Sequence, residues 1–271
     1  RPESDGSMLR FKARLVAKGF SQVGGVDYHE TFAPVVTYKS VRVLLALAAA
    51  MDLDLDQMDV STAFLYGALE EEIYMKAPGE LGLDTGEVLR LRRDIYGLKQ
   101  ASRAWNTELD RFLTGLGFTR CVSDPCVYVR RRGGSLIVIA VYVDDLIIAS
   151  DNVEQKDELK GRLSAQYKMT DLGRLEWFLG MHVQRDRAAK IITLDQETYI
   201  EKVLARFHMQ DCNMVSTPWV TRLSVSDCPA TDADRLDMAR VPYNSAVGSL
   251  MYAAIATRPD IAASVSALCR F

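Results

Sequence analysis

The chain has 271 residues, of which 48% are hydrophobic and 25% are charged, and its formal net charge is −3. These proportions are ordinary for a globular protein and exclude a disordered tail, a collagen-like repeat and a coiled-coil rod. The longest uninterrupted apolar stretches, residues 43–51 and 136–143, have nine and eight residues, whereas a membrane-spanning helix needs about 20. We therefore expect no membrane partner. Because the first residue is Arg1 rather than Met, we also expect a piece of a longer protein.

Hydrophobic periodicity predicts the first elements. An apolar segment rich in Ala and Leu predicts a helix over residues 40–50, and mixed acidic and apolar residues predict a strand over residues 53–60. Residues 101–116 place Trp105 and other large apolar side chains on one helical face, which is typical of core packing. Further strands are predicted over residues 126–131, 136–143 and 146–149, where β-branched residues gather.

The second half of the chain also mixes helices and strands. An amphipathic helix is predicted over residues 153–167, and Asp195 is the predicted N-cap of a helix over residues 196–207. A hairpin is predicted from residues 177–184 and 190–194, with a turn at 185–189. Because short connections between strands give antiparallel pairs, we expect an α+β fold with an antiparallel sheet backed by helices.

Charge is distributed in blocks that the whole-chain average hides. Residues 1–20 hold five basic and two acidic residues, residues 52–87 hold ten acidic residues and one lysine, and residues 87–132 hold ten basic and five acidic residues. Such blocks are either solvated faces of opposite sign or a negative pocket between positive flanks. The five cysteines contain no C-x-x-C pair and the three histidines are far apart, so we expect reduced thiols and no zinc site.

The strongest local signal is a pair of adjacent acids, Asp144 and Asp145, between two apolar runs. Asp is common in turns, so a plain hairpin turn is one interpretation. The other is a bound divalent cation, because carboxylates placed between apolar strands are costly to bury without a compensating charge. Asp59, at the end of a predicted strand, could share that cation, and Mg²⁺ prefers such oxygen ligands. Pairs of such ions support phosphoryl transfer.

Several longer segments follow one another in an order that is hard to attribute to chance. They are KARLVAKGFSQ at 12–22, YHETFAPV at 28–35, QMDVSTAFLYG at 57–67, IYGLKQASRAW at 95–105, YVDD at 142–145, FLGM at 178–181, STP at 216–218, VGSLMY at 247–252 and ATRPD at 256–260. In these segments the chain resembles the reverse transcriptase domain of copia-type LTR retrotransposon Pol polyproteins.

The resemblance implies a right-hand polymerase. Residues 1–210 would form the fingers and the palm with its antiparallel sheet, residues 211–242 an irregular connection, and residues 243–271 a truncated start of the thumb. A short acidic helix is expected within the connection, at residues 232–240, and the final stretch is expected to be helical.

The implied activity is RNA-directed DNA polymerisation. Deoxynucleotides would be added to a primer 3′-OH on an RNA or DNA template, with two Mg²⁺ ions or, alternatively, Mn²⁺. The implied partners are the RNase H, integrase and protease regions of the polyprotein, for which the chain shows no pattern. The implied location is the cytoplasm, within virus-like particles, with the nucleus as the alternative.

The resemblance also assigns catalytic and metal-binding roles. Asp59 and Asp144 match the metal-bridging aspartates, and the carbonyl of Val60 is an additional ligand. Asp145 completes the pair of acids in a supporting, partly electrostatic role. Phe64 matches a steric gate that excludes a ribose 2′-OH, although plain core packing explains a Phe at this position equally well.

Further residues match nucleotide-binding and nucleic-acid-binding positions. Either Lys12 or Arg14 would contact the triphosphate, Gly97 would let the backbone approach the base pair, and Lys99 would bind phosphate. Ser102 stands where many relatives have Pro, which reduces rigidity at the start of the helix. The residues expected to contact template or primer are Arg103, Tyr142, Phe178, Leu179 and Gly180.

Two other functions remain open from the sequence. A catalytically silent nucleic-acid-binding remnant of a transposon would be free to lose its acids, whereas Asp59, Asp144 and Asp145 are all present. A metal-dependent phosphohydrolase would use a similar acid cluster but would need neither Phe64 nor the 97–99 segment. The intact acids therefore favour the polymerase.

Overall fold

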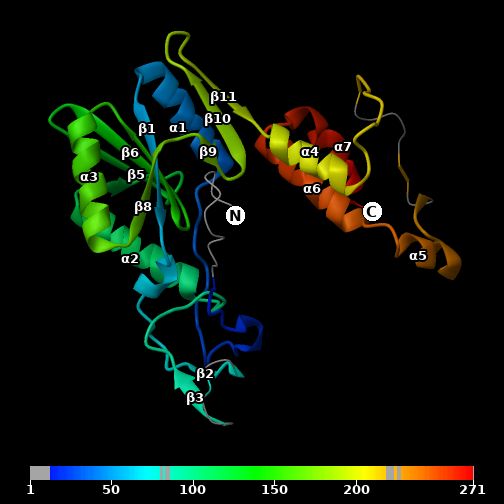
Figure 1. Cartoon of the computed structure of the whole chain (residues 1–271), viewed down its shortest axis with the longest axis horizontal. Helices are drawn as coiled ribbons and strands as arrows, with labels where there is room; N and C mark the ends of the chain where they lie inside the picture. The colour runs from blue at the N-terminus through cyan, green and yellow to red at the C-terminus, as the bar shows by residue number, and fades with distance from the viewer. Residues whose placement is uncertain (1–12, 80–81, 83–85, 218–222, 225–226, 271) are drawn as a thin grey trace. The chain divides into compact units, whose positions relative to one another are not determined.

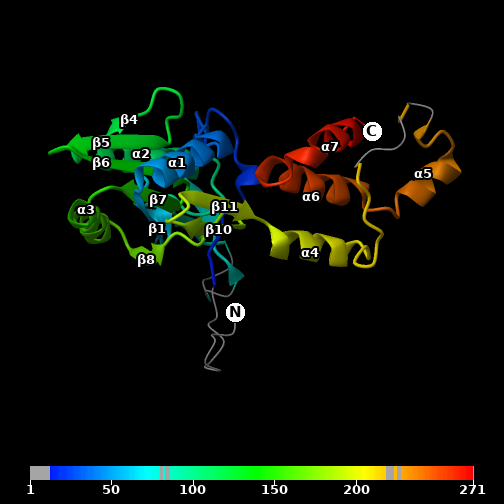
Figure 2. The same cartoon turned by 90° about the horizontal axis from the view of Figure 1, so that it is seen from above.

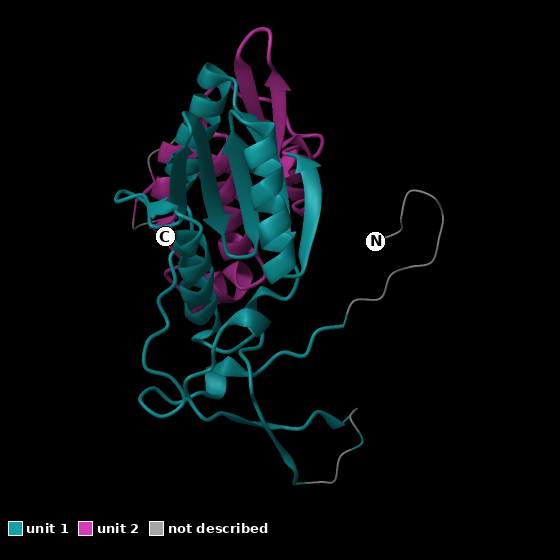
Figure 3. Ribbon diagram, turned by 90° about the vertical axis from the view of Figure 1, so that its left-hand side faces the viewer, with its two compact units in different colours: residues 1–174 teal, residues 175–271 magenta. Residues whose placement is uncertain are grey.

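The computed structural model describes residues 13–79, 82, 86–217, 223–224 and 227–270. The chain forms two compact units, Arg1–Arg174 and Leu175–Phe271, shown in different colours in Figure 3. The expected division at residue 210, between the catalytic part and the irregular connection, stays a prediction. The assignment of fingers, palm and thumb to these parts stays a prediction.

The first unit is built on a six-stranded antiparallel sheet (Figure 1). Its strand order is β4-β5-β6-β7-β1-β8. The strands are β1 (Asp54–Val60), β4 (Thr119–Arg120), β5 (Val127–Arg132), β6 (Ser135–Tyr142), β7 (Asp145–Ser150) and β8 (Met169–Arg174). β6 and β7 are the apolar runs of the sequence and are buried over most of their length. The antiparallel pairing of β1 with β7 brings two segments that are about ninety residues apart into register.

Three helices belong to this unit: α1 (Tyr38–Met51), α2 (Ala101–Gly115) and α3 (Val153–Gln166). Thr37 is the N-cap of α1, and its hydroxyl accepts a hydrogen bond from the amide of Ser40. α2 and α3 meet where Tyr167, the residue after α3, packs edge-on against Trp105 of α2. Trp105 and Tyr167 are both buried, so the large side chains of this interface form part of the core.

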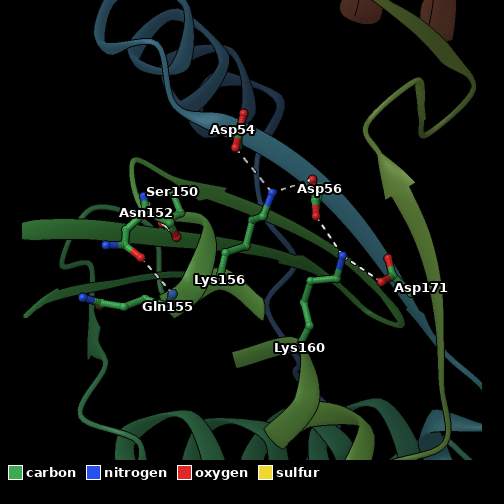
Figure 4. A network of polar contacts seen from close by, with 8 residues as sticks. All are labelled: Asp54, Asp56, Ser150, Asn152, Gln155, Lys156, Lys160 and Asp171. Atoms are coloured by element: carbon green, nitrogen blue, oxygen red, sulfur yellow. Dashed lines mark hydrogen bonds and ion pairs between the residues drawn. The ribbon is translucent and has the colours of Figure 1, made fainter. Parts of the chain in front are cut away.

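α3 is tied to β1 by a network of ion pairs (Figure 4). Lys156 lies 3.1 Å from Asp56 and 3.7 Å from Asp54, and Lys160 bridges Asp56 at 2.8 Å and Asp171 at 2.7 Å. Because neighbouring strand residues point to opposite faces, Asp54 and Asp56 face α3 whereas Gln57 and Asp59 face away from it. The acids of β1 thus divide into a structural pair and a candidate catalytic residue.

Smaller elements complete this unit. A two-stranded hairpin joins β2 (Tyr74–Lys76) to β3 (Val88–Arg90), and short 3₁₀ helices span Gly19–Ser21 and Ala63–Tyr66. The second of these helices directly follows β1, so Phe64 lies close in the chain to Asp59.

The second unit has a three-stranded antiparallel sheet and a group of helices. The sheet order is β11-β10-β9, from β9 (Trp177–Phe178), β10 (Met181–Asp186) and β11 (Ile191–Asp195). The helices are α4 (Glu197–Arg206), α5 (Asp232–Met238), α6 (Tyr243–Ala256) and α7 (Ala262–Leu268), with a 3₁₀ turn at Pro259–Ile261. α6 packs against both α4 and α7, as Figures 1 and 2 show.

Comparison with the expectations confirms the mixture of helices and antiparallel sheet and corrects several details. The predicted strand 177–184 is broken by a turn, because Leu179 and Gly180 both have positive φ. Its hairpin turn lies at residues 187–190 rather than 185–189. The residue at the N-cap of α4 is Gln196, while Asp195 ends β11 and its carboxylate accepts a hydrogen bond from the amide of Glu197. Within the described residues, no helix combines the length and apolarity needed to cross a bilayer.

Candidate active site

The structure brings Asp59, Asp144 and Asp145 together at one end of the β1–β7 pair. Asp59 and Asp145 are direct cross-strand partners, so their side chains project from the same face of the sheet. Asp144 occupies the two-residue turn between Tyr142 and Asp145, and its carbonyl accepts a 2.9 Å hydrogen bond from the amide of Val60. Asp59 and Asp145, which are 86 residues apart in sequence, are thereby neighbours near the ends of adjacent strands.

The electrostatic surroundings of Asp145 are unfavourable for a charged carboxylate. Burial raises the pKa of Asp145 above its ordinary value, and the negative charges of Asp144 and Asp59 raise it further. One contact opposes this shift, because Gln57 donates a 3.2 Å hydrogen bond from Nε2 to Oδ1 of Asp145. A cation placed among these three acids would offset both the cost of burying charged carboxylates and the repulsion between them.

The chemistry of this donor set fits a hard divalent cation such as Mg²⁺. Carboxylate oxygens are the ligands that Mg²⁺ prefers, and they are supplied here by Asp59 and Asp144 beside Asp145. In the part of the chain that the structure describes, no three His, Cys, Asp or Glu side chains are already arranged closely enough to hold a metal ion. Phosphate oxygens of a substrate commonly complete such a site, as they do in many Mg²⁺ enzymes.

Tyr96 joins the acids to Phe64 and Arg14. Its ring centroid lies 4.6 Å from that of Phe64, and the Arg14 guanidinium lies 5.4 Å from the Tyr96 centroid. Burial raises the pKa of Tyr96, Asp144 and Asp59 raise it further, and Arg14 lowers it. No sequence signal marks a role for Tyr96, because the tertiary contacts that connect it to both groups are not visible in the sequence.

Phe64 is half-buried and packs against a small apolar cluster formed by Ile73, Leu98 and Ala101. Part of its surface is therefore core, as the alternative interpretation of this residue expected. The ring also contacts Tyr96 beside the acids, so a gating role stays a prediction.

Two glycines allow the segments around residues 17–19 and 96–97 to lie against each other. The amide of Ala17 donates a 2.7 Å hydrogen bond to the carbonyl of Tyr96. A Cβ added to Gly19 would lie 1.9 Å from the carbonyl oxygen of Gly97, and one added to Gly97 would lie 2.1 Å from that of Ala17. Gly97 also has a φ of 95°. The close approach that the sequence assigned to a base pair is made here by the chain itself.

Lys99 makes its contacts within the protein. Its Nζ donates to the carbonyl of Gln22 at 3.3 Å and to the hydroxyl of Tyr28 at 3.1 Å, and it lies 4.7 Å from the Tyr28 ring centroid. The predicted contact with phosphate would compete with these bonds. Lys12, the other lysine predicted to bind nucleotide, lies outside the described residues.

Arg103 faces a cavity of about 450 Å³ along α2. Its guanidinium donates a 3.4 Å hydrogen bond to the carbonyl of Phe32 and lies 4.0 Å from Glu30. The cavity is also lined by Glu70, Glu71 and Glu108. These carboxylates make the surroundings of Arg103 less favourable for phosphate than the sequence suggested, and its predicted contact with nucleic acid stays a prediction.

The remaining predicted nucleic-acid contacts are divided between the units. Tyr142 is half-buried and ends β6 beside the acidic turn. Phe178, Leu179 and Gly180 lie in the second unit, where the hydroxyl of Tyr252 donates to the carbonyl of Leu179. The Phe178 side chain is buried, with 1% of its surface exposed, so any contact made by this segment would come from the turn after it.

Comparison with known proteins gives consistent similarities. A family model described as "Reverse transcriptase (RNA-dependent DNA polymerase)" matches residues 2–221. The chain is 45% identical over 276 residues to the retrovirus-related Pol polyprotein from transposon TNT 1-94 of Nicotiana tabacum. The match covers 100% of this chain and 21% of that protein. The chain is also 40% identical over 273 residues to the retrovirus-related Pol polyprotein from transposon RE1 of Arabidopsis thaliana. That match covers 99% of this chain and 18% of the polyprotein.

A shorter protein is also similar. The putative transposon Ty5-1 protein of Saccharomyces cerevisiae is 35% identical over 216 residues, covering 79% of this chain and 68% of that protein. Against the two plant polyproteins, in contrast, the chain spans about a fifth of their length.

Proposed function

Because the chain belongs to the reverse transcriptase (RNA-dependent DNA polymerase) family, in the form found in copia-type transposon Pol polyproteins, we propose that it polymerises DNA on an RNA or DNA template. Deoxynucleotides would be added to a primer 3′-OH. The observation that carries this proposal is the cross-strand pairing of Asp59 with Asp145, with Asp144 in the adjoining turn. The pairing supports the proposal because it puts three acidic residues at the same end of the β1–β7 pair.

Asp59 and Asp144 would hold Mg²⁺, with the carbonyl of Val60 as a further ligand and Mn²⁺ as an alternative ion. When bound, such ions activate the primer hydroxyl and neutralise charge on the transferred phosphate and the leaving pyrophosphate. The repulsion that raises the pKa of Asp145 supports a cation at this position. Asp145 itself would act mainly through its charge, since its carboxylate is already held by Gln57.

The residues beside the acids would receive the nucleotide. Arg14 would pair with the triphosphate, and Lys12 is the alternative for this role. The edge formed by Phe64 and Tyr96 would contact the sugar, so that a ribose 2′-OH meets the Phe64 ring. The ring centroids of Phe64 and Tyr96 are 4.6 Å apart, and this packing supports a rigid surface beside the sugar, as a steric gate requires.

The proposal includes nucleic-acid contacts in each of the two units. In this proposal Tyr142 and Arg103, which lie within the predicted fingers and palm, contact nucleic acid, and the Leu179–Gly180 turn contacts the primer end. The RNase H, integrase and protease regions of a longer polyprotein would be its covalent partners, as the polyprotein relatives suggest.

Primer extension on an RNA template with Mg²⁺ tests the proposal. The wild-type chain should bind the template–primer and extend it, Asp144→Asn should bind without extending, and Asp237→Asn, which changes an exposed acid of α5, should behave as the wild type. If neither the wild type nor Asp144→Asn extends a primer that both bind, the silent nucleic-acid-binding remnant is correct instead. Hydrolysis of deoxynucleotides without extension would favour the phosphohydrolase.

A further inference from the structure

The turn that carries the acids contains a strained residue. Val143, the first residue of the turn, has a φ of 56°. Positive φ is a genuine outlier for a β-branched side chain, because its Cβ substituents crowd the backbone in this conformation. Such a conformation persists only where the surrounding structure holds it.

Two hydrogen bonds hold the turn, one to each of its central carbonyls. The indole Nε1 of Trp105 donates to the carbonyl of Val143 at 2.7 Å, and the amide of Val60 donates to the carbonyl of Asp144 at 2.9 Å. The first bond comes from α2 and the second from β1. The positions of Asp144 and Asp145 are thus fixed from two elements at once.

The Trp105 ring is itself fixed in orientation. It is 1% exposed, and the ring of Tyr167 packs edge-on against it with a centroid separation of 5.2 Å. Tyr66 lies on another side at 6.1 Å, and the hydroxyl of Tyr66 accepts a 2.7 Å hydrogen bond from the amide of Lys168. Core packing accounts for the burial of the indole. It does not explain why the indole N–H bonds to the carbonyl of Val143, the residue of the acidic turn that has a positive φ.

We propose that Trp105 is a positioning residue for the acidic turn. Its N–H holds the carbonyl of Val143 so that Val143 keeps its positive φ and Asp144 and Asp145 keep their directions. Trp105 acts through the turn and contacts neither nucleotide nor template. This inference rests on the proposed polymerase function, but the hydrogen bond itself can be tested without activity.

Trp105→Phe tests the role of the N–H, because Phe retains an aromatic ring and lacks the donor. Loss of a buried hydrogen bond of this kind should lower the rate of nucleotide addition at saturating deoxynucleotide by about tenfold. The dissociation constant for template–primer should change by less than about twofold. The matched control is Phe112→Leu, which removes a ring that packs against Tyr167 from the same helix without contacting the turn. This control should lose stability while keeping its rate.

Amide hydrogen exchange gives a readout that does not depend on activity. Exchange at residues 143–146 should become faster in Trp105→Phe and should stay at the wild-type rate in Phe112→Leu. If the wild-type chain proves unable to extend a primer, this comparison still decides whether Trp105 holds the turn.

A second substitution separates positioning from general damage. Val143→Gly removes the side-chain conflict, since glycine adopts positive φ readily. Combined with Trp105→Phe, it should therefore restore part of the lost rate, by about threefold or more. The proposal is overturned if Trp105→Phe retains the wild-type rate and exchange pattern. It is equally overturned if the effects of Trp105→Phe match those of Phe112→Leu, or if Val143→Gly restores nothing.

Discussion

Gln57 and Asp145, on neighbouring strands, are joined by a 3.2 Å hydrogen bond that runs from Nε2 of the amide to Oδ1 of the carboxylate. Gln57 is 8% exposed and Asp145 is partly exposed, so the bond is partly buried. It is the contact that lowers the pKa of Asp145, against burial and two like charges that raise it. An uncharged side chain two residues before Asp59 therefore favours the charged form of the neighbouring acid.

Gln57→Leu should lower the rate of primer extension by about tenfold or more, since a buried hydrogen bond to a charged group contributes about 1.5–3 kcal/mol. Gln155→Leu is a suitable control, because it removes an amide that bonds to the carbonyl of Arg132, away from the acids. Steady-state kinetics at saturating template–primer measure the effect. Equal rates for Gln57→Leu and wild type would contradict the role given to this bond.

The burial of Asp94 should make the stability of the folded state depend on pH in an unusual way. Its side chain is fully buried, and neither carboxylate oxygen has a hydrogen-bond partner among the described residues. Burial raises the pKa of Asp94 to about 6, with a further contribution from Glu71. Between the unfolded value of 3.8 and about 6, the folded state binds the proton more tightly, so stability falls as pH rises through this window.

Asp94→Asn should therefore be more stable than the wild type at pH 7.5, by about 1–3 kcal/mol, and should lose this advantage below about pH 4. Urea unfolding at the two pH values measures the difference. Asp157→Asn, at an exposed position of α3, should show no such pH-dependent gain. A gain for Asp94→Asn that is the same at both pH values would show that ionisation is not the cause.

Gly97→Ala should disturb the contact between the 17–19 segment and residues 96–97, beside the proposed nucleotide-binding residues. The new Cβ would lie 2.1 Å from a backbone oxygen, at a φ of 95°. We expect a loss of more than about 1 kcal/mol in stability and a higher KM for deoxynucleotide. Gly115→Ala, where nothing lies within 4 Å of the added Cβ, should instead stabilise α2 by about 0.5–1 kcal/mol. A wild-type KM for deoxynucleotide in Gly97→Ala would show that this contact does not affect nucleotide binding.

The ion-pair network of Figure 4 predicts a large effect from a residue with no catalytic role. Asp56 accepts from both Lys156 and Lys160, and all three side chains are at most 13% exposed. Asp56→Ala should cost about 3 kcal/mol, because removing one partner leaves buried positive charge. Arg162→Ala, which breaks an exposed pair with Glu158 on the same helix, should cost less than about 0.5 kcal/mol. Chemical denaturation distinguishes the two, and similar losses would contradict the burial argument.

The main strands and helices could be predicted because their signals are local. β6 and β7 are continuous apolar runs, and α1 and α2 have apolar faces of helical period. β8 could not be predicted in this way, since most of its residues are polar and exposed. It is held by pairing with β1, which is a long-range contact, and by the ion pair of Asp171 with Lys160, which lies eleven residues earlier in the chain.

The same distinction applies to the candidate site. The acids were found because two adjacent carboxylates between apolar strands are unusual in any sequence. Gln57, Tyr96 and Trp105 were not assigned a role, because each acts through a partner at least 32 residues away. The turn at Leu179 and Gly180 was read as strand, since its positive φ values follow from the structure rather than from composition.

The central claim is that Asp59, Asp144 and Asp145 act as one site. The most direct test is the rate of single-nucleotide addition on an RNA template by the three Asp→Asn variants and by the Asp59→Asn/Asp144→Asn pair. We expect Asp59→Asn and Asp144→Asn each to slow addition by about a hundredfold or more, and Asp145→Asn to have a smaller effect. The paired variant should be no slower than the worse single variant, because residues that work as a unit are not additive. A wild-type rate for Asp59→Asn or Asp144→Asn, or losses that multiply in the pair, would contradict a shared site.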